Sequence, residues 1–456
     1  SGVPRSTLAD ALSPRRSRLP TLDLVRRFVA ACGVDAEGRR RWEAVWLRLR
    51  CADLPRPGPV DARPPVEERT VGAPGPGTRP PDEPTTAGPS LLPAAVADFV
   101  GRDKAVARLV ALLTQSGDRS APVVVSAVAG RGGVGKTALA VRVAHRLVDQ
   151  FPDGQLYVDL RGASAQPADP AVILARFLRW LGVDGAAVPA ELEERAALYR
   201  SRLAGRRVLV VLDNAGSAAQ VAPLLPGSGT CAVLVTSRSR LADLPGVRRL
   251  DLDVLEPAEA VELLAAVVGR ETVAGEPEAA YRIAELCGFL PLAVRIAGAR
   301  LAARPHRRLE WLATRLADDR RRLSELSLGD LDLRSSLTLS YRSLPPAAAR
   351  ALRLLAQLEA PDFAAWTAMP LLQAGRDEAE ELVDTLAEAY LVDPVGTDAT
   401  GCVRYRMHDL VRLHAREMSA AEDTDAERRA ALTRLAGAWL AVAERANARN
   451  GVWELP

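Results

Sequence analysis

One octapeptide in this chain of 456 residues has the residue types and spacing needed to hold a chain of phosphates. It runs from Gly130 to Thr137, reads GRGGVGKT, and matches the pattern G-x-x-x-x-G-K-[ST] at every fixed position. The chain has 60 basic side chains but only two lysines, and one of these, Lys136, stands in the pattern. A compact ammonium suits β- and γ-phosphate oxygens, and the Thr137 hydroxyl suits Mg²⁺.

The sequence around the octapeptide supplies the elements that such a loop requires. Residues 122–129 are apolar and β-branched, which predicts a strand, and the residues from Ala138 onward have the apolar spacing of a helix. A glycine loop between the two would direct backbone N–H groups and the helix N-terminus at phosphate oxygens. The loop residues expected to contact nucleotide are Gly130, Gly132, Gly133, Val134, Gly135, Lys136, Thr137 and Ala138.

Two polar residues at predicted strand ends would complete the phosphate site. Asp213 follows the apolar segment 207–212, where a carboxylate can hold Mg²⁺. Alone, this aspartate could equally start a turn or cap a helix, but the loop upstream favours the metal role. Arg238 follows segment 231–236 and could reach a γ-phosphate, the alternative being an ordinary surface arginine. The predicted catalytic residues are Lys136, Asp213 and Arg238, and the predicted metal ligands are Thr137 and Asp213.

Strands and helices alternate after the loop. A second strand is expected at 155–159, and helices are expected at 171–181 and 192–204. This alternation predicts an α/β fold with a parallel sheet covered by helices. Helical patterns continue through 257–326.

The carboxyl-terminal part of the sequence is mainly helical. Within 335–390 the pattern is helical, and the segments 391–395 and 402–406 predict two short strands, which together suggest a winged helix. Residues 424–448 predict a further amphipathic helix.

The amino-terminal part of the sequence has a different composition. Residues 1–50 hold eleven arginines against five acids, and twelve of the 33 prolines lie between Pro55 and Pro93. The basic segment predicts a small helical module, and the proline-rich segment predicts an extended linker.

The composition excludes several classes of protein. The five cysteines are an odd number without a C-x-x-C pair, so neither a disulfide framework nor a zinc site is indicated. No apolar run approaches the roughly 18 residues of a membrane span. We therefore expect a cytoplasmic protein without membrane contact.

The order of six short motifs resembles the NB-ARC nucleotide switch of plant resistance proteins, apoptosome adaptors and bacterial transcriptional regulators of the signal-transduction ATPase (STAND) class. These motifs are FVGR at 99–102, the phosphate loop, LVVLDN at 209–214, LVTSR at 234–238, GFLPLA at 288–293 and MHD at 407–409. The resemblance covers residues 96–420. It implies a P-loop NTPase sheet followed by a helical subdomain and a winged helix.

The resemblance also implies roles for single residues. Val100 and Arg102 would contact the adenine side of ADP or ATP through their backbone, and Pro291 would pack against the base or ribose. His408 would hold the β-phosphate of ADP and lock the winged helix in the resting state. Asn214 departs from relatives that carry a second acid here, and an amide cannot act as a general base. We therefore expect slow hydrolysis and a switch-like use of nucleotide.

The predicted organisation has six parts. They are a partial helix-turn-helix-like segment (1–50), a proline-rich linker (51–95), a P-loop nucleotide-binding domain (96–255), a helical ARC subdomain (256–330), a winged-helix domain (331–420) and the start of a helical region, with helical repeats as one alternative (421–456). The first segment resembles the later helices of a repressor-type DNA reader, with the recognition helix opening at 6–8. The alternative is an arginine-rich helix pair that packs on the main body.

The predicted function is a bacterial transcriptional regulator that is autoinhibited with ADP and self-associates with ATP. DNA would bind through the amino-terminal module. Two alternatives remain open: a constitutive P-loop ATPase, and a defence or scaffold protein that uses the same switch without touching DNA.

Overall fold

The structure is a computed structural model that describes residues 88–114, 124–241, 243–399 and 401–450. The predicted helix-turn-helix segment and most of the predicted linker lie outside these residues. The last residues of that linker are described, and they extend the edge of the nucleotide-binding sheet. The backbone N–H of Gln155 donates to the carbonyl of Pro89 at 2.6 Å, and that of Leu91 donates to the carbonyl of Gln155 at 3.1 Å.

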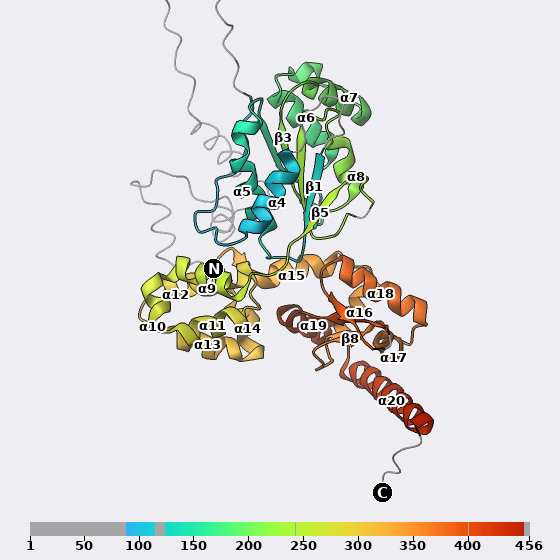
Figure 1. The fold of residues 1–456 in the computed structure, drawn as a ribbon. Coiled ribbons are helices and arrows are strands. Elements are labelled where there is room, and N and C mark those ends of the chain that lie inside the picture. Colours follow the sequence, from blue (N-terminus) through green and yellow to red (C-terminus); the bar gives the residue numbers. More distant parts are fainter. Residues whose placement is uncertain (1–87, 115–123, 242, 400, 451–456) are drawn as a thin grey trace, which may run out of the picture. The chain divides into compact units, whose positions relative to one another are not determined.

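A five-stranded parallel sheet forms the centre of the nucleotide-binding region (Figure 1). Its strands are β1 (Val124–Ala129), β2 (Gln155–Asp159), β3 (Leu209–Ala215), β4 (Ala232–Ser237) and β5 (Arg248–Asp251), in the order β2-β3-β4-β1-β5. The predicted α/β fold is confirmed. The sequence did not predict β5, because three of its four residues are charged and only Leu250 is buried.

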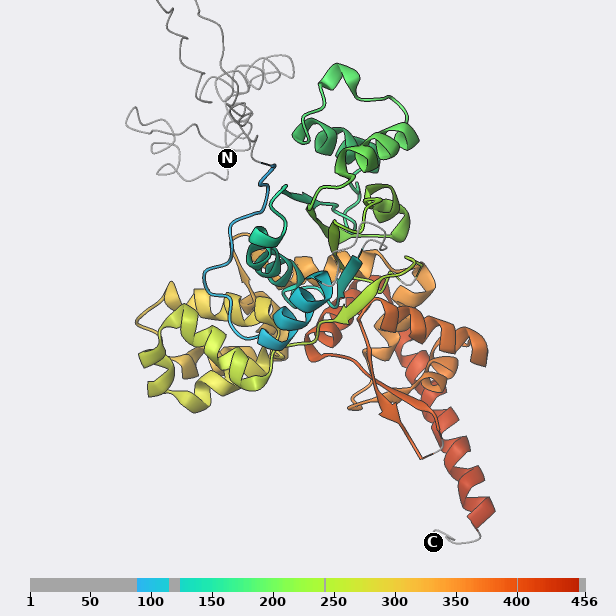
Figure 2. The same cartoon turned by 45° about the horizontal axis from the view of Figure 1, so that its top comes forward.

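Helices cover both faces of this sheet, as the continuous apolar strands require. Val211 and Leu234 pack on one face with α4 (Asp103–Thr114) and α5 (Lys136–Arg146). The neighbouring residues Val210 and Val233 point to the other face. The helices on that face are α6 (Pro170–Trp180), α7 (Leu192–Leu203) and α8 (Ala218–Val221). Both views separate the two helical layers (Figures 1 and 2).

A bundle of helices follows the sheet in the chain, drawn in yellow in Figure 2. Its members are α9 (Pro257–Val268), α10 (Arg270–Gly275), α11 (Pro277–Leu286), α12 (Pro291–Ala302), α13 (Leu309–Ala317) and α14 (Asp319–Glu325). Three of these helices begin with proline, which has no N–H to lose at that position. A short hairpin of β6 (Ser327–Leu328) and β7 (Leu331–Asp332) ends the bundle.

The next part has the helices and sheet of a winged helix. Its helices are α15 (Leu333–Arg342), α16 (Pro346–Leu355), α17 (Ala368–Leu372), α18 (Arg376–Glu388) and α19 (Asp409–Glu422). Its sheet has three strands instead of the two expected, in the order β8 (Phe363–Ala364), β10 (Val403–Arg406), β9 (Asp393–Thr397). β8 has only two residues, which is too short for a periodic pattern.

The remaining short elements and the last helix complete the fold. The 3₁₀ turns are η1 (Val148–Gln150), η2 (Gly185–Ala187), η3 (Ala222–Leu224) and η4 (Ala365–Thr367). The helix expected at 424–448 is observed as α20 (Asp425–Asn450). Of the helices in the described residues, none is both long and apolar enough to span a membrane.

Candidate nucleotide-binding site

The glycine loop connects β1 to the N-terminus of α5. Gly133 and Gly135 have φ angles of 81° and 93°, a region that side chains with a Cβ avoid. A Cβ at Gly132 would lie 2.5 Å from Nη1 of Arg238 and 3.1 Å from the carbonyl of Ser336, so a larger residue here would displace the Arg238 guanidinium. The first turn of α5 has N–H groups without helical partners, and it lies at the cavity described below. An anion is therefore favoured at this end of the helix.

Lys136 is buried at the start of α5. Its Nζ donates to the carbonyl oxygens of Gly130 at 2.7 Å and Arg131 at 2.9 Å. Burial, and next the positive charge of Arg238, lower the pKa of Lys136 to about 7. Phosphate oxygens would place negative charge beside this ammonium and favour its charged form, so the site is suited to a polyanion.

Asp213 stands in β3 opposite Thr137 and is 5% exposed. The hydroxyl of Thr137 donates to its two carboxylate oxygens, at 2.9 and 3.0 Å. The hydroxyls of Thr236 and Tyr157 also donate to this carboxylate, at 2.5 and 3.1 Å. Burial and then the charge of Asp213 raise the pKa of Tyr157. A hydroxyl and a carboxylate are the hard oxygen donors that Mg²⁺ prefers, so these two residues fit the predicted ion and would hold it beside the phosphates.

A cavity of about 580 Å³ extends from the loop and Asp213 to an apolar wall. Phe99 and Val100 lie on this wall, together with Leu255 and Pro291. Its volume suits a ligand of nucleotide size, with phosphates at the polar end and a base at the apolar end.

The side chain of Arg102 forms hydrogen bonds that hold the phosphate-binding loop at this cavity. Its Nη2 donates to the carbonyls of Asp253 at 2.5 Å and Val134 at 3.4 Å. The backbone N–H of Arg102, which the resemblance assigned to the adenine side, donates to Glu259 at 2.9 Å.

Most of the predicted site residues line this one cavity. They are Val100, Arg102, Gly133, Val134, Gly135, Lys136, Thr137, Ala138, Asp213, Arg238 and Pro291. Gly130, Gly132 and His408 do not line it.

Comparison with known proteins agrees with this geometry. The family model described as the NB-ARC domain matches residues 102–274. This chain contains an NB-ARC domain. It is 49% identical over 449 residues to Regulatory protein AfsR of Streptomyces griseus, covering 97% of this chain and 45% of that protein. The chain is 51% identical over 362 residues to Regulatory protein AfsR of Streptomyces coelicolor. This match covers 78% of this chain and 36% of that protein. The chain spans less than half the length of each relative.

One solved structure that matches part of this chain is a STAND protein with a tetratricopeptide repeat sensor from Pyrococcus horikoshii. It matches 76% of this chain and 46% of that chain, at 19% identity and a TM-score of 0.34.

His408, in the MHD motif of this NB-ARC protein, forms a hydrogen bond with the helical bundle. Its Nε2 donates to the carbonyl of Gly288 at 3.0 Å, and its Nδ1 accepts from the backbone N–H of Leu410 at 3.2 Å. Burial, followed by the charge of Arg131, lowers the pKa of His408 to about 4, so the ring is neutral near pH 7. Both ring nitrogens are engaged in this arrangement, and the contact to a β-phosphate stays a prediction.

Arg238 joins the nucleotide cavity to the winged helix of the NB-ARC protein. Its Nη1 donates to the carbonyl of Ser336 at 2.8 Å and to the hydroxyl of Ser340 at 3.2 Å, both on α15. Burial lowers the pKa of this guanidinium, while Asp213 opposes that effect. Removal of α15 would leave a buried cation without these partners, and an anion would then be a favourable replacement.

Sequence reasoning missed several residues at this site. Tyr157 and Thr236 hold the Asp213 carboxylate, and Asp159 lines the cavity at the end of β2. Their positions near the carboxyl ends of predicted parallel strands are the signal that could have identified them. No sequence signal would have found the ion pair between Asp98 and Arg295, residues 197 positions apart.

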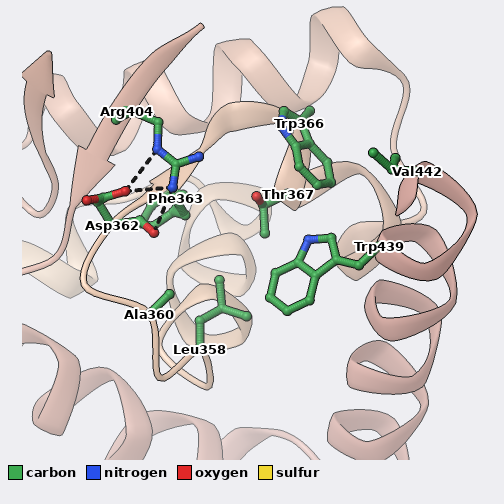
Figure 3. Close-up of a pocket in the computed structure, with 9 residues that line it drawn as sticks. All are labelled: Leu358, Ala360, Asp362, Phe363, Trp366, Thr367, Arg404, Trp439 and Val442. Carbon is green, nitrogen blue, oxygen red and sulfur yellow. Dashed lines mark hydrogen bonds and ion pairs between the residues drawn. The ribbon is translucent and has the colours of Figure 1, made fainter. Parts of the chain in front are cut away.

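A second, open cavity of about 360 Å³ lies between the winged helix and α20 (Figure 3). Trp366 and Trp439 line it, and Arg404 is hydrogen-bonded to Asp362 at 2.6 Å on its edge. None of the predicted nucleotide-binding residues lines this cavity. The phosphate chemistry therefore belongs to the larger cavity.

Proposed function

We propose that this chain is the nucleotide switch of a bacterial transcriptional regulator, closed with ADP and open with ATP. The observation that supports this proposal most strongly is the contact of Arg238, a residue of the phosphate end of the cavity, with Ser336 on α15. A residue shared between the cavity and the winged helix can couple the ligand to the arrangement of the two parts.

The coupling follows from competition for one buried guanidinium. In the closed arrangement Arg238 is satisfied by a serine carbonyl and a serine hydroxyl. A γ-phosphate carries more negative charge than either partner, so ATP favours release of α15 and ADP does not. The difference in binding free energy between the two nucleotides sets the populations of the two states.

The remaining parts of the proposal extend to the whole protein. The two AfsR relatives carry the name of regulatory proteins, which supports a regulatory role. DNA would be the partner, bound through the amino-terminal module. Mg²⁺ would bind with the nucleotide at Thr137 and Asp213. Release of the winged helix would free the nucleotide-binding domain for self-association in the cytoplasm.

The first test is to denature freshly purified protein and identify the released nucleotide by chromatography. We expect near-stoichiometric ADP, because the phosphate loop and the closed winged helix together hold a slowly exchanging ligand. The Lys136→Ala variant is the control, and it should be purified without nucleotide, since the ammonium that faces the phosphates is lost.

Other outcomes would favour the alternative functions. A protein that is purified empty and rapidly hydrolyses added ATP would be a constitutive ATPase. A full-length protein that self-associates with ATP but never binds promoter DNA would be a defence or scaffold protein.

A further inference from the structure

A second carboxylate lies beside Asp213, on the neighbouring strand. β2 and β3 run parallel, and Asp159 is the residue opposite Asp213 in their register. Adjacent strands lie about 4.8 Å apart, and residues opposite each other point to the same side of the sheet. Asp159 and Asp213 accordingly line the same cavity.

The two carboxylates have different surroundings. Asp213 is 5% exposed and accepts hydrogen bonds from three hydroxyl groups. Asp159 is exposed, and its Oδ1 accepts from the backbone N–H of Arg161 at 2.8 Å and from the side-chain amide of Asn214 at 3.4 Å. Within the described part of the chain, no hydrogen bond is made to its Oδ2. This oxygen is therefore available to a water molecule in the cavity.

The conformation of Asn214 accounts for the contact with Asp159. Asn214 has a φ of 56°, and its backbone N–H donates to the hydroxyl of Thr236 at 2.9 Å. Its amide reaches the Asp159 carboxylate on the next strand. The position after Asp213 thus holds an amide, which cannot take up a proton, while the carboxylate lies one strand away.

We propose that Asp159 is the general base of ATP hydrolysis in this protein, an inference that rests on the ATP binding proposed above. The oxygen of a water molecule bonds to the γ-phosphorus while the bond between that phosphorus and the β,γ-bridging oxygen breaks. The bridging oxygen leaves with the electron pair as part of ADP. The Asp159 carboxylate takes the proton lost by the water and then releases it to solvent, so that the products are ADP, inorganic phosphate and a proton.

Asp213 is less suited to this role. Its carboxylate is buried, holds Thr137 and is the proposed metal ligand, so its lone pairs are engaged. The exposed Asp159 is available but also solvated, and solvation weakens a base that acts in the transition state. A base of this kind agrees with the slow turnover expected of a switch.

The decisive variant is Asp159→Asn, which removes the charge but keeps an oxygen acceptor for the Arg161 N–H. Hydrolysis is measured in single turnovers of the full chain with γ-³²P-labelled ATP and Mg²⁺. We expect the rate to fall about 100-fold. Affinities for fluorescent mant-ATP and mant-ADP should be unchanged, because Asp159 does not hold the phosphates.

The matched control exchanges the two side chains in the double variant D159N/N214D. It returns a carboxylate to the cavity from β3, at a position whose positive φ aspartate tolerates. We expect hydrolysis to recover relative to D159N. An equally low rate in the exchanged variant would assign Asp159 to local structure and overturn the proposal.

Two further results would overturn the proposal. One is a fall of less than about tenfold in D159N, which is too small for loss of a general base. The other is a wild-type protein that binds ATP and never hydrolyses it. A wild-type protein that binds no nucleotide would instead contradict the proposed function, so the two failures are distinguishable.

Discussion

Arg131, the second residue of the phosphate-binding loop, forms an ion pair with Asp393 on β9 of the winged helix. The side chain of Arg131 is 5% exposed and that of Asp393 is 38% exposed. Among the described residues, the buried Nη1 of Arg131 has no hydrogen-bond partner. The loop that would surround the phosphates is therefore joined to the winged helix by a direct ion pair. The guanidinium of Arg131 keeps one N–H donor group that has no partner among the described residues.

Asp393→Asn should speed the dissociation of ADP. The substitution removes the charge that holds Arg131 to the winged helix and so weakens the closed arrangement. Because Asp393 is partly exposed, solvent screens the pair, and we expect about 1 kcal/mol, or about a fivefold faster rate. Dissociation of mant-ADP, chased with unlabelled nucleotide, measures this rate.

The matched control for Asp393→Asn is Glu380→Gln. Glu380 pairs with Arg376 within α18, on an exposed face of the same winged helix. Removal of this pair should leave the ADP dissociation rate unchanged. Equal rates in wild type and Asp393→Asn would show that the ion pair does not stabilise the closed state.

Arg238→Ala should weaken ATP binding more than ADP binding. The variant removes a guanidinium that a γ-phosphate would attract, whereas ADP lacks that group. Truncation of a charged hydrogen-bonding partner costs about 1.5–3 kcal/mol, or at least about tenfold in ATP affinity. Titration with mant-ATP and mant-ADP gives both affinities.

A control for Arg238→Ala is Arg176→Ala, since Arg176 lies on α6 and stacks over Trp180 away from the cavity. It should leave both affinities unchanged. Equal losses for the two nucleotides in Arg238→Ala would argue against a γ-phosphate sensor.

Local sequence patterns predicted the strands and helices around the phosphate site. Contacts between residues far apart in the chain were visible only in the structure. The strand at 155–159 was predicted with its observed bounds, because the apolar residues of β2 lie between the polar residues Gln155 and Asp159. Lys136, Thr137 and Asp213 were predicted since their chemistry is encoded in short motifs. The pair of Arg131 and Asp393 was not, because 262 positions separate its partners and no local pattern records their meeting.

Nucleotide affinity should depend on pH through Lys136. Burial lowers the pKa of this ammonium to about 7 from 10.5, and bound phosphates favour its charged form. Above a pH of about 7, binding must therefore take up a proton, and ADP affinity should fall as the pH rises, approaching about tenfold per unit. Calorimetry in buffers with different heats of ionisation measures the proton uptake.

The Lys136→Arg variant serves as the control for this linkage. A guanidinium stays protonated over the same range, so no proton should be taken up on binding. Proton uptake that persists in this variant would assign the linkage to a different group.

Acid should destabilise the folded protein through His408 and His414. Burial is the main cause that lowers the pKa of each ring from 6.5 to about 4. The carboxylates that face them, Asp409 and Asp393 at His408 and Glu417 at His414, oppose this effect only in part. The unfolded chain binds more protons than the folded chain between these values. The free energy of unfolding should therefore be fully retained above pH 6.5 and fall as the pH drops towards 4.

The slope of that fall is bounded by about 1.4 kcal/mol per pH unit for each histidine. Chemical denaturation at a series of pH values measures it. His408→Gln keeps a donor for the carbonyl of Gly288 and does not titrate, so it should remove one histidine's share of the slope. If the slope is the same in this variant and in wild type, the His408 ring is not buried as a neutral group between the winged helix and the helical bundle.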